Sequence, residues 1–342
     1  MNDLRLSACP EQKKLLTGLC DKSTNTLEEP SEMISTNEAA HKLEPNVASD
    51  GSPTTQEDPR KEPDLQKQLG AMVEVLKNSD EVDQLVLRNT GLTDTLLQDL
   101  ADALKSSLSE VTMINLNLNH IGPSGVNTLL ELIRSKPHLK SLFIFGNQLG
   151  DSGVQALLLG LAELQYKTIW ATEAPSQSEA TPAATVEPQL PAFTGFSLRE
   201  LDLGGNSMGG AGLRVLATYL RRHSQLQYLG LGQTSDPDGA AWADLFDSLK
   251  ANAHLAHIIL DECGLGDHGV KLFAEALKAS MSLSKVDLDG NGIAESGGNA
   301  ILEALVSRRH SPLQHLSIEE GNYITTALMM KILQEMNRLA PL

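Results

Sequence analysis

The sequence predicts an α/β fold of the solenoid type, in which short strand-and-helix units stack side by side. The first observation is a spacing of apolar residues shown by "LRELDLGGNSM", which starts at Leu198. The second is that copies of this pattern start at 82, 111, 139, 198, 226, 255, 283 and 313, with spacings of 28 to 30 residues apart from one of 59. The third is helical spacing of apolar residues between copies, as in "HGVKLFAEALKAS". A fixed period of this length is typical of a solenoid.

Each copy places a polar or small residue at its ninth position, which we call the Asn position. A buried Asn amide there can satisfy backbone groups that lose their partners where the chain turns out of a strand. A hydroxyl or thiol can do part of the same task. In chain order, the Asn position holds Thr90, Asn119, Asn147, Asn206, Thr234, Cys263 and Asn291.

Two local motifs suggest other functions, and the repeat explains both. "DLDGNGIAESGG", from Asp287, begins like a calcium-binding EF-hand loop, but its twelfth residue is Gly298 where the loop requires Glu. "GLGDHG" matches a dinucleotide-binding turn, but Gly269 aligns with glycines of the sister repeats. We therefore expect no calcium and no nucleotide cofactor. Gly269 is instead predicted to be a position where helix and strand pack closely.

The pattern LxxLxLxxN, a following Gly and a long helix resemble the leucine-rich repeats of the ribonuclease-inhibitor type over residues 82–342, apart from one insertion. The resemblance implies a curved arc with parallel strands on the concave face and helices on the convex face. Proteins with such repeats include the ligand-sensing ends of innate immune receptors, Ran GTPase-activating protein and tropomodulins. Most of these bind other proteins, so the resemblance favours a non-enzymatic scaffold or adaptor.

A regulator of a small GTPase is the alternative function. Ran GTPase-activating protein uses an Asn and a nearby Arg from its repeats. Arg88 and Asn89, in "LRNTGL", match that pair only loosely. No nucleophile–base pair, metal-ligand spacing or cofactor motif is otherwise present, so the sequence predicts no enzyme.

The chain divides into a tail and a repeat domain. Residues 1–62 are rich in Ser, Thr, Pro and Glu, and we expect a disordered acidic tail. Residues 63–342 are predicted to form the repeat domain, with helical caps over 65–79 and 324–342 that cover its two ends. A flexible insertion is expected at 166–196, where the spacing is 59; Trp170 is its candidate anchor for a docking partner.

Composition limits the partners. The 342-residue chain has 27 Lys and Arg against 44 Asp and Glu, a net charge of −17. Nucleic acid and anionic membrane are therefore unlikely to bind, because their phosphates are repelled. The chain has three cysteines and no apolar leader, which indicates a reducing compartment, the cytoplasm or nucleus.

The residues between the apolar positions of each strand are predicted to point out of the concave face. Equivalent residues of stacked strands lie about 4.8 Å apart and form columns. Carboxylates accumulate in these columns toward the C-terminal end, which favours a basic protein partner, and aromatic residues nearby can supply contact area. The candidate partner-binding residues are Phe143, Phe145, Asp202, Tyr228, Ile259, Asp261, Asp287, Asp289 and Glu319.

Overall fold

Parallel strands form one open sheet along the repeat domain. The computed structural model describes residues 3–7, 62–173, 196, 198–222, 224–234, 236, 239–308, 311 and 313–339. Within them, nine strands lie side by side in chain order, and all neighbouring pairs except β1–β2 are parallel. The strands are β1 (Asp3–Ser7), β2 (Gln84–Arg88), β3 (Met113–Asn115), β4 (Ser141–Phe143), β5 (Glu200–Asp202), β6 (Tyr228–Gly230), β7 (His257–Ile259), β8 (Lys285–Asp287) and β9 (His315–Ser317).

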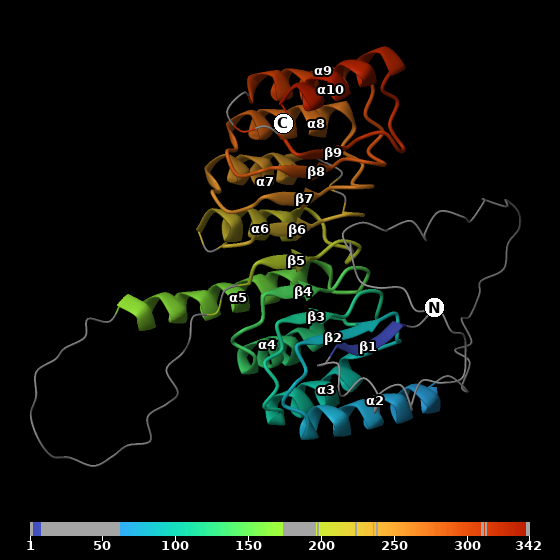
Figure 1. The fold of residues 1–342 in the computed structure, drawn as a ribbon, viewed down its shortest axis with the longest axis vertical. Coiled ribbons are helices and arrows are strands. Elements are labelled where there is room, and N and C mark those ends of the chain that lie inside the picture. The colour runs from blue at the N-terminus through green and yellow to red at the C-terminus, as the bar shows by residue number, and fades with distance from the viewer. Residues whose placement is uncertain are drawn as a thin grey trace, which may run out of the picture.

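Helices connect the strands and cover one face of the sheet. They are α2 (Glu62–Asn78), α3 (Asp94–Ser106), the 3-10 helix η1 (Pro123–Gly125), α4 (Val126–Ser135), α5 (Gly150–Glu173), α6 (Gly210–Arg222), α7 (Ala240–Ala251), α8 (Gly266–Ala279), α9 (Glu295–Ser307) and α10 (Thr326–Leu339). The units stack along the long axis of the molecule, from α2 at one end to α9 and α10 at the other (Figure 1). We call the opposite, helix-free face of the sheet the strand face.

The repeat register follows the apolar pattern. Each of the strands β2 to β9 begins two residues after a predicted repeat start, and the central residues of β3 to β8 are fully buried, as is Leu85 of β2. Burial of a continuous row of Leu, Ile and Val between sheet and helices is the main stabilising contribution in such a stack. The predicted α/β solenoid is confirmed.

Five residues of the tail that was predicted to be disordered form a strand. Asp3–Ser7 forms strand β1, which pairs antiparallel with β2 over five residue pairs, from Asp3 opposite Arg88 to Ser7 opposite Gln84. The open edge of β2 offers unpaired backbone groups, and an extended segment can satisfy them even when it carries no repeat pattern. The remainder of the predicted tail, up to residue 61, lies outside the described residues.

The insertion begins as a continuation of a helix. Helix α5 has 24 residues and extends past its neighbours (Figure 1), so residues 166–173 of the predicted insertion, Trp170 among them, are helical. Residues 174–195 lie outside the described part of the chain. Phe196 is buried, and β5 pairs with β4 as if no insertion intervened. The insertion therefore leaves the register of the solenoid unchanged.

Aspartates in the first turn of a helix connect neighbouring repeats. The Asp151 carboxylate accepts hydrogen bonds from the backbone N–H of Gly209 and of Gly212, each at 2.8 Å. Asp267 repeats this arrangement three units later, with Ala294 at 2.8 Å and Gly297 at 2.9 Å. Both pairs of donors belong to the start of the next helix, where N–H groups have no partner within the helix. Gly212 and Gly297 leave the room that each carboxylate needs.

We expect Asp151→Ala to lower the free energy of unfolding by about 1 to 2 kcal/mol, because two helix-start donors lose their acceptor. Urea unfolding followed by circular dichroism measures the change. Asp99→Ala is the matched control, since Asp99 is exposed on α3, and we expect it to change stability by less than about 0.5 kcal/mol. Equal effects of the two substitutions would contradict a connecting role for Asp151.

Candidate functional site

The Asn positions form a hydrogen-bonded ladder through the core. The Nδ2 group of Asn119 donates to Leu87 O of the preceding repeat at 2.7 Å and to Leu116 O of its own repeat at 2.8 Å. Asn206 bridges to Ile144 O at 2.9 Å across the insertion. Asn147 and Asn291 make equivalent bonds to the preceding and their own repeats. These side chains hold adjacent turns together, so this set is structural in the described chain.

The other Asn positions are satisfied less fully. The Thr90 hydroxyl donates to Leu87 O and to Asn119, and the buried Cys263 thiol donates to Leu231 O at 3.2 Å. The buried Thr234 hydroxyl has no hydrogen-bond partner among the described residues. Sequence reasoning missed Asn322, whose amide bonds Leu288 O and Ile318 O, because it lies one residue beyond the expected position of the last copy.

Aromatic rings lie on the strand face at β4, β6 and β7. The Phe143 and Tyr228 rings meet edge to face at 6.1 Å, and the Tyr228 and His257 rings do so at 5.0 Å. The Tyr228 and His257 residues are direct neighbours in the register of β6 and β7, and Lys285 and His315 continue their column. Desolvation and the charge of Lys285 lower the pKa of His257 to about 4, so this imidazole is neutral at physiological pH.

Two carboxylates converge on a patch of glycines in the middle of this face. Gly204, Gly230 and Gly232 form the patch, which we call the glycine patch. A Cβ atom at Gly230 would collide with the Asp202 carboxylate, and one at Gly232 would collide with that of Asp261. Asp202 therefore lies against β6 from one side and Asp261 from the other. The absence of a side chain at Gly230 and at Gly232 permits this arrangement.

The pKa of each of these two carboxyl groups is raised above its ordinary value. Burial raises the pKa of Asp202 to about 6, opposed by the hydrogen bond from Gly204 N at 3.1 Å. Burial and the nearby charge of Asp287 raise the pKa of Asp261 to about 6. The Oδ1 atom of Asp261 is buried and has no hydrogen-bond partner in the described chain. Removal from water without compensation disfavours the charged form of a carboxyl group.

The remaining predicted acids occupy different settings. Asp289 accepts hydrogen bonds from the Ser317 hydroxyl and from Glu320 N, so it holds the turn after β9. The half-buried Asp287 accepts one from Asp289 N at 3.0 Å. Glu319 is exposed, and the half-buried Ile259 lies between Gly230 and Asp287 in the register. The half-buried Phe145 ring lies over Gly204.

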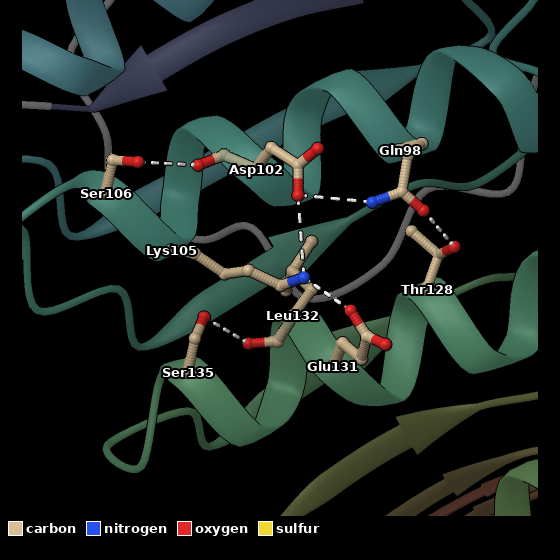
Figure 2. Close-up of polar contacts among 8 residues, drawn as sticks. All are labelled: Gln98, Asp102, Lys105, Ser106, Thr128, Glu131, Leu132 and Ser135. Atoms are coloured by element: carbon tan, nitrogen blue, oxygen red, sulfur yellow. Dashed lines mark hydrogen bonds and ion pairs between the residues drawn. The ribbon is translucent and has the colours of Figure 1, made fainter.

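Several charged side chains of the helical face form ion pairs. Figure 2 shows Lys105 of α3 between Asp102 of its own helix and Glu131 of α4. Lys278 makes the equivalent pairs with Glu275 and Glu303, each at 2.8 Å. Within the described chain, no Lys or Arg forms an ion pair with any of the strand-face carboxylates Asp202, Asp261, Asp287, Asp289 and Glu319.

Other chemistries receive no support from the described residues. They contain no group of three or more His, Cys, Asp and Glu side chains arranged to hold a metal ion. Arg88 ends β2, and Asn89 follows it on an exposed turn with φ of 53°. Among the described helices, none has the length and apolarity needed to cross a bilayer.

Comparisons with known proteins agree with the geometry. The Leucine Rich repeat family profile matches residues 135–158 and 196–217. The chain is 28% identical to ribonuclease inhibitor of Sus scrofa over 211 residues, 61% of this chain and 45% of that protein. It is 28% identical to NACHT, LRR and PYD domains-containing protein 3 of Bos taurus over 227 residues, 56% of this chain and 22% of that protein. The chain is 32% identical to NACHT, LRR and PYD domains-containing protein 12 of Homo sapiens over 181 residues, 52% of this chain and 17% of that protein.

The chain is a leucine-rich-repeat protein of the ribonuclease-inhibitor type. It spans less than half the length of each of these relatives. Its repeats form a scaffold of the kind that binds proteins.

Proposed function

We propose that this chain is a non-enzymatic intracellular adaptor whose strand face binds a protein with a basic surface. The observation that carries the proposal is the difference in charge pairing between the two faces. On the helical face, Glu131, Asp247 and Glu303 pair with a Lys or Arg of the preceding helix, whereas the strand-face carboxylates have no such partner within the described residues. A cationic surface would supply the missing counter-charge.

The aromatic residues support the same face as the contact surface. Phe143, Tyr228 and His257 form a continuous run of rings across β4, β6 and β7. Rings beside charged groups are frequent at the centres of protein interfaces, where they provide contact area at low entropic cost. The name of the porcine relative states that it inhibits ribonuclease, another protein, which is consistent with binding through this type of scaffold.

Lys285 and His315 narrow the kind of partner that the strand face can bind. They lie in the column beside Asp287 and Ser317, so the C-terminal part of the strand face carries both signs of charge. A uniformly basic segment is best accommodated near Asp202 and Asp261 and along the exposed Glu319 and Glu320. The partner is expected to contact the cationic column with neutral or acidic groups.

Affinity capture from cell extract tests the proposal when wild type is compared with a charge-reversed strand face. The variant carries Asp261→Lys, Asp287→Lys and Glu319→Lys, and leaves Asp289 and its hydrogen bonds intact. We expect it to lose basic partners that the wild type retains. Circular dichroism establishes that both proteins are folded.

The control moves the same charge change to the helical face, with Asp99→Lys, Asp247→Lys and Glu303→Lys. All three acids are exposed there. We expect this variant to retain the wild-type partners. Loss of the same partners from both variants would show that net charge alone governs binding and would contradict a strand-face site.

A further inference from the structure

The C-terminal end of the stack leaves apolar side chains uncovered. Leu316, the central residue of β9, is only half-buried, whereas the central residues of β3 to β8 are fully buried. In the same unit, Tyr323 is 76% exposed and Leu333 is 38% exposed. β9 and α10 lie at the opposite end of the stack from β1 and α2 (Figure 1). Within the described residues, no further strand follows β9 in the sheet.

Three side chains of α10 form an apolar stripe, which we call the end stripe: Met329, Leu333 and Met336. When the bridging Asn amides of the last two repeats are aligned, the end stripe falls on the positions of three α9 residues: Gly298, Leu302 and Leu305. Gly298 faces the following helix, since a Cβ atom there would collide with Leu328 of α10. Leu130 occupies the Leu302 position in α4, and it likewise lies against Gly160 of α5. The end stripe is therefore the surface on which a further helix would pack.

The sheet ends at β9 in a strand edge with no described neighbour. In the preceding repeat, Leu288 donates its N–H to Ser317 O of the next strand at 2.8 Å. Ile318 is the equivalent of Leu288 in the last repeat, and alternate residues of a strand direct their backbone groups to the same side. The backbone groups of Leu316 therefore point to the outer side of β9. An edge of this kind can pair with a further strand.

The surface that covers this end has to extend both layers. A single extended peptide would cover the edge of β9 and leave the end stripe exposed, and a single helix would do the reverse. The N-terminal end of another copy does not fit, because β1 already pairs with the outer edge of β2. The C-terminal end of a second copy offers a strand edge and an apolar helix side at the same separation. A contact between two identical surfaces closes as a dimer.

We propose that two copies of this chain associate end to end through β9 and α10, related by a twofold axis. The inference goes beyond the proposed function, because it concerns the end of the arc and not the strand face. An axis that crosses the sheet between the two copies makes their β9 strands antiparallel and keeps all helices on one side. Both strand faces then lie on the other side of the dimer.

The residues at this end suit such an axis. Leu316 is the middle residue of β9, and Leu333 is the middle residue of the end stripe, so each lies opposite its own copy at the axis. Two facing Leu316 residues whose backbone groups point outward exchange both N–H···O bonds, as in an antiparallel pair. In this register Glu319 lies opposite Leu313. The two exposed Glu319 side chains are then at opposite ends of the paired strands, so their repulsion does not oppose the contact.

Sedimentation velocity of the full chain over a range of concentrations tests the proposal. We expect wild type to pass from the mass of one chain to twice that mass as the concentration rises. Leu333→Glu places two carboxylates at the axis and should raise the dissociation constant of the dimer by about tenfold or more. Leu159→Glu is the matched control, because Leu159 is 60% exposed on α5 of the helical face. We expect it to change that constant by less than about twofold.

A mixture of two charged variants separates loss of association from loss of folding. Leu333→Lys should also remain a monomer when alone, whereas an equimolar mixture with Leu333→Glu should form dimers, since opposite charges then meet at the axis. A wild type that stays monomeric at every concentration overturns the proposal. So does a mixture that associates no better than either variant alone. Neither result affects the strand-face proposal, because its capture experiment changes other residues.

Discussion

Asn206→Ala is expected to lower the free energy of unfolding by about 3 to 4 kcal/mol, a large part of the stability of a typical domain. Asn206 is fully buried, and its Nδ2 group lies within hydrogen-bonding distance of Ile144 O, Leu203 O and Gly204 O. Alanine would leave these carbonyls without that donor in the core. The Oδ1 atom of Asn206 also accepts a hydrogen bond from Leu149 N. The bond to Ile144 O connects the repeats on either side of the insertion, so its loss should weaken the stack at that junction.

Thr234→Ala is the matched control, because Thr234 occupies the same position two repeats away from Asn147 and one from Asn206. Its hydroxyl is buried but makes no hydrogen bond within the part of the chain that the structure describes. Alanine there should therefore cost only the lost methyl packing, about 1 kcal/mol. Urea unfolding of both variants gives the comparison. Equal losses of unfolding free energy would show that the buried volume of the side chain, and not the hydrogen bonds of the Asn amides, explains the effect of the Asn position on stability.

The repeat register could be predicted because it depends on local pattern alone. An apolar residue at every inward position of a short strand leaves one arrangement in which all of them are buried, and a one-residue slip would expose the row. The pairing of β1 could not be predicted in this way. Its partner, β2, is about 80 residues away, and an edge strand is held by backbone groups that every sequence carries.

The candidate site could be predicted only in part. The columns that contain Asp202 and Asp261 follow from the repeat, but the direction in which each carboxylate leans does not. That direction depends on a contact between repeats. The neighbouring repeat carries Gly at the facing position, so no side chain fills the space into which the carboxylate leans. The sequence does contain a signal for it, since Gly230 and Gly232 stand in outward positions where strands rarely carry Gly. Asp289 shows the opposite case, because its bonds to Ser317 and Glu320 N are invisible in the pattern.

Asp202→Asn is expected to make the protein more stable at pH 7.5, by about 3 kcal/mol at most. The pKa of this carboxyl is raised by burial to about 6 in the folded protein, whereas an unfolded chain has a pKa near 4. Between these values the folded state binds the proton more tightly than the unfolded state. The contribution of Asp202 to stability is thus greatest at low pH and falls as the pH rises to about 6, after which it stays constant.

An amide has the size of the carboxyl and keeps the oxygen that accepts the bond from Gly204 N, but it carries no charge to desolvate. The stability difference between variant and wild type should therefore grow from pH 4 to pH 6.5 and then level off. Chemical unfolding across pH 4 to 8 measures this difference, and it cancels the titration of the other carboxyl groups. Asp289→Asn should show no gain, because the carboxylate of Asp289 is satisfied by Ser317 and Glu320 N. A pH-independent difference for Asp202→Asn would contradict the raised pKa of this carboxyl.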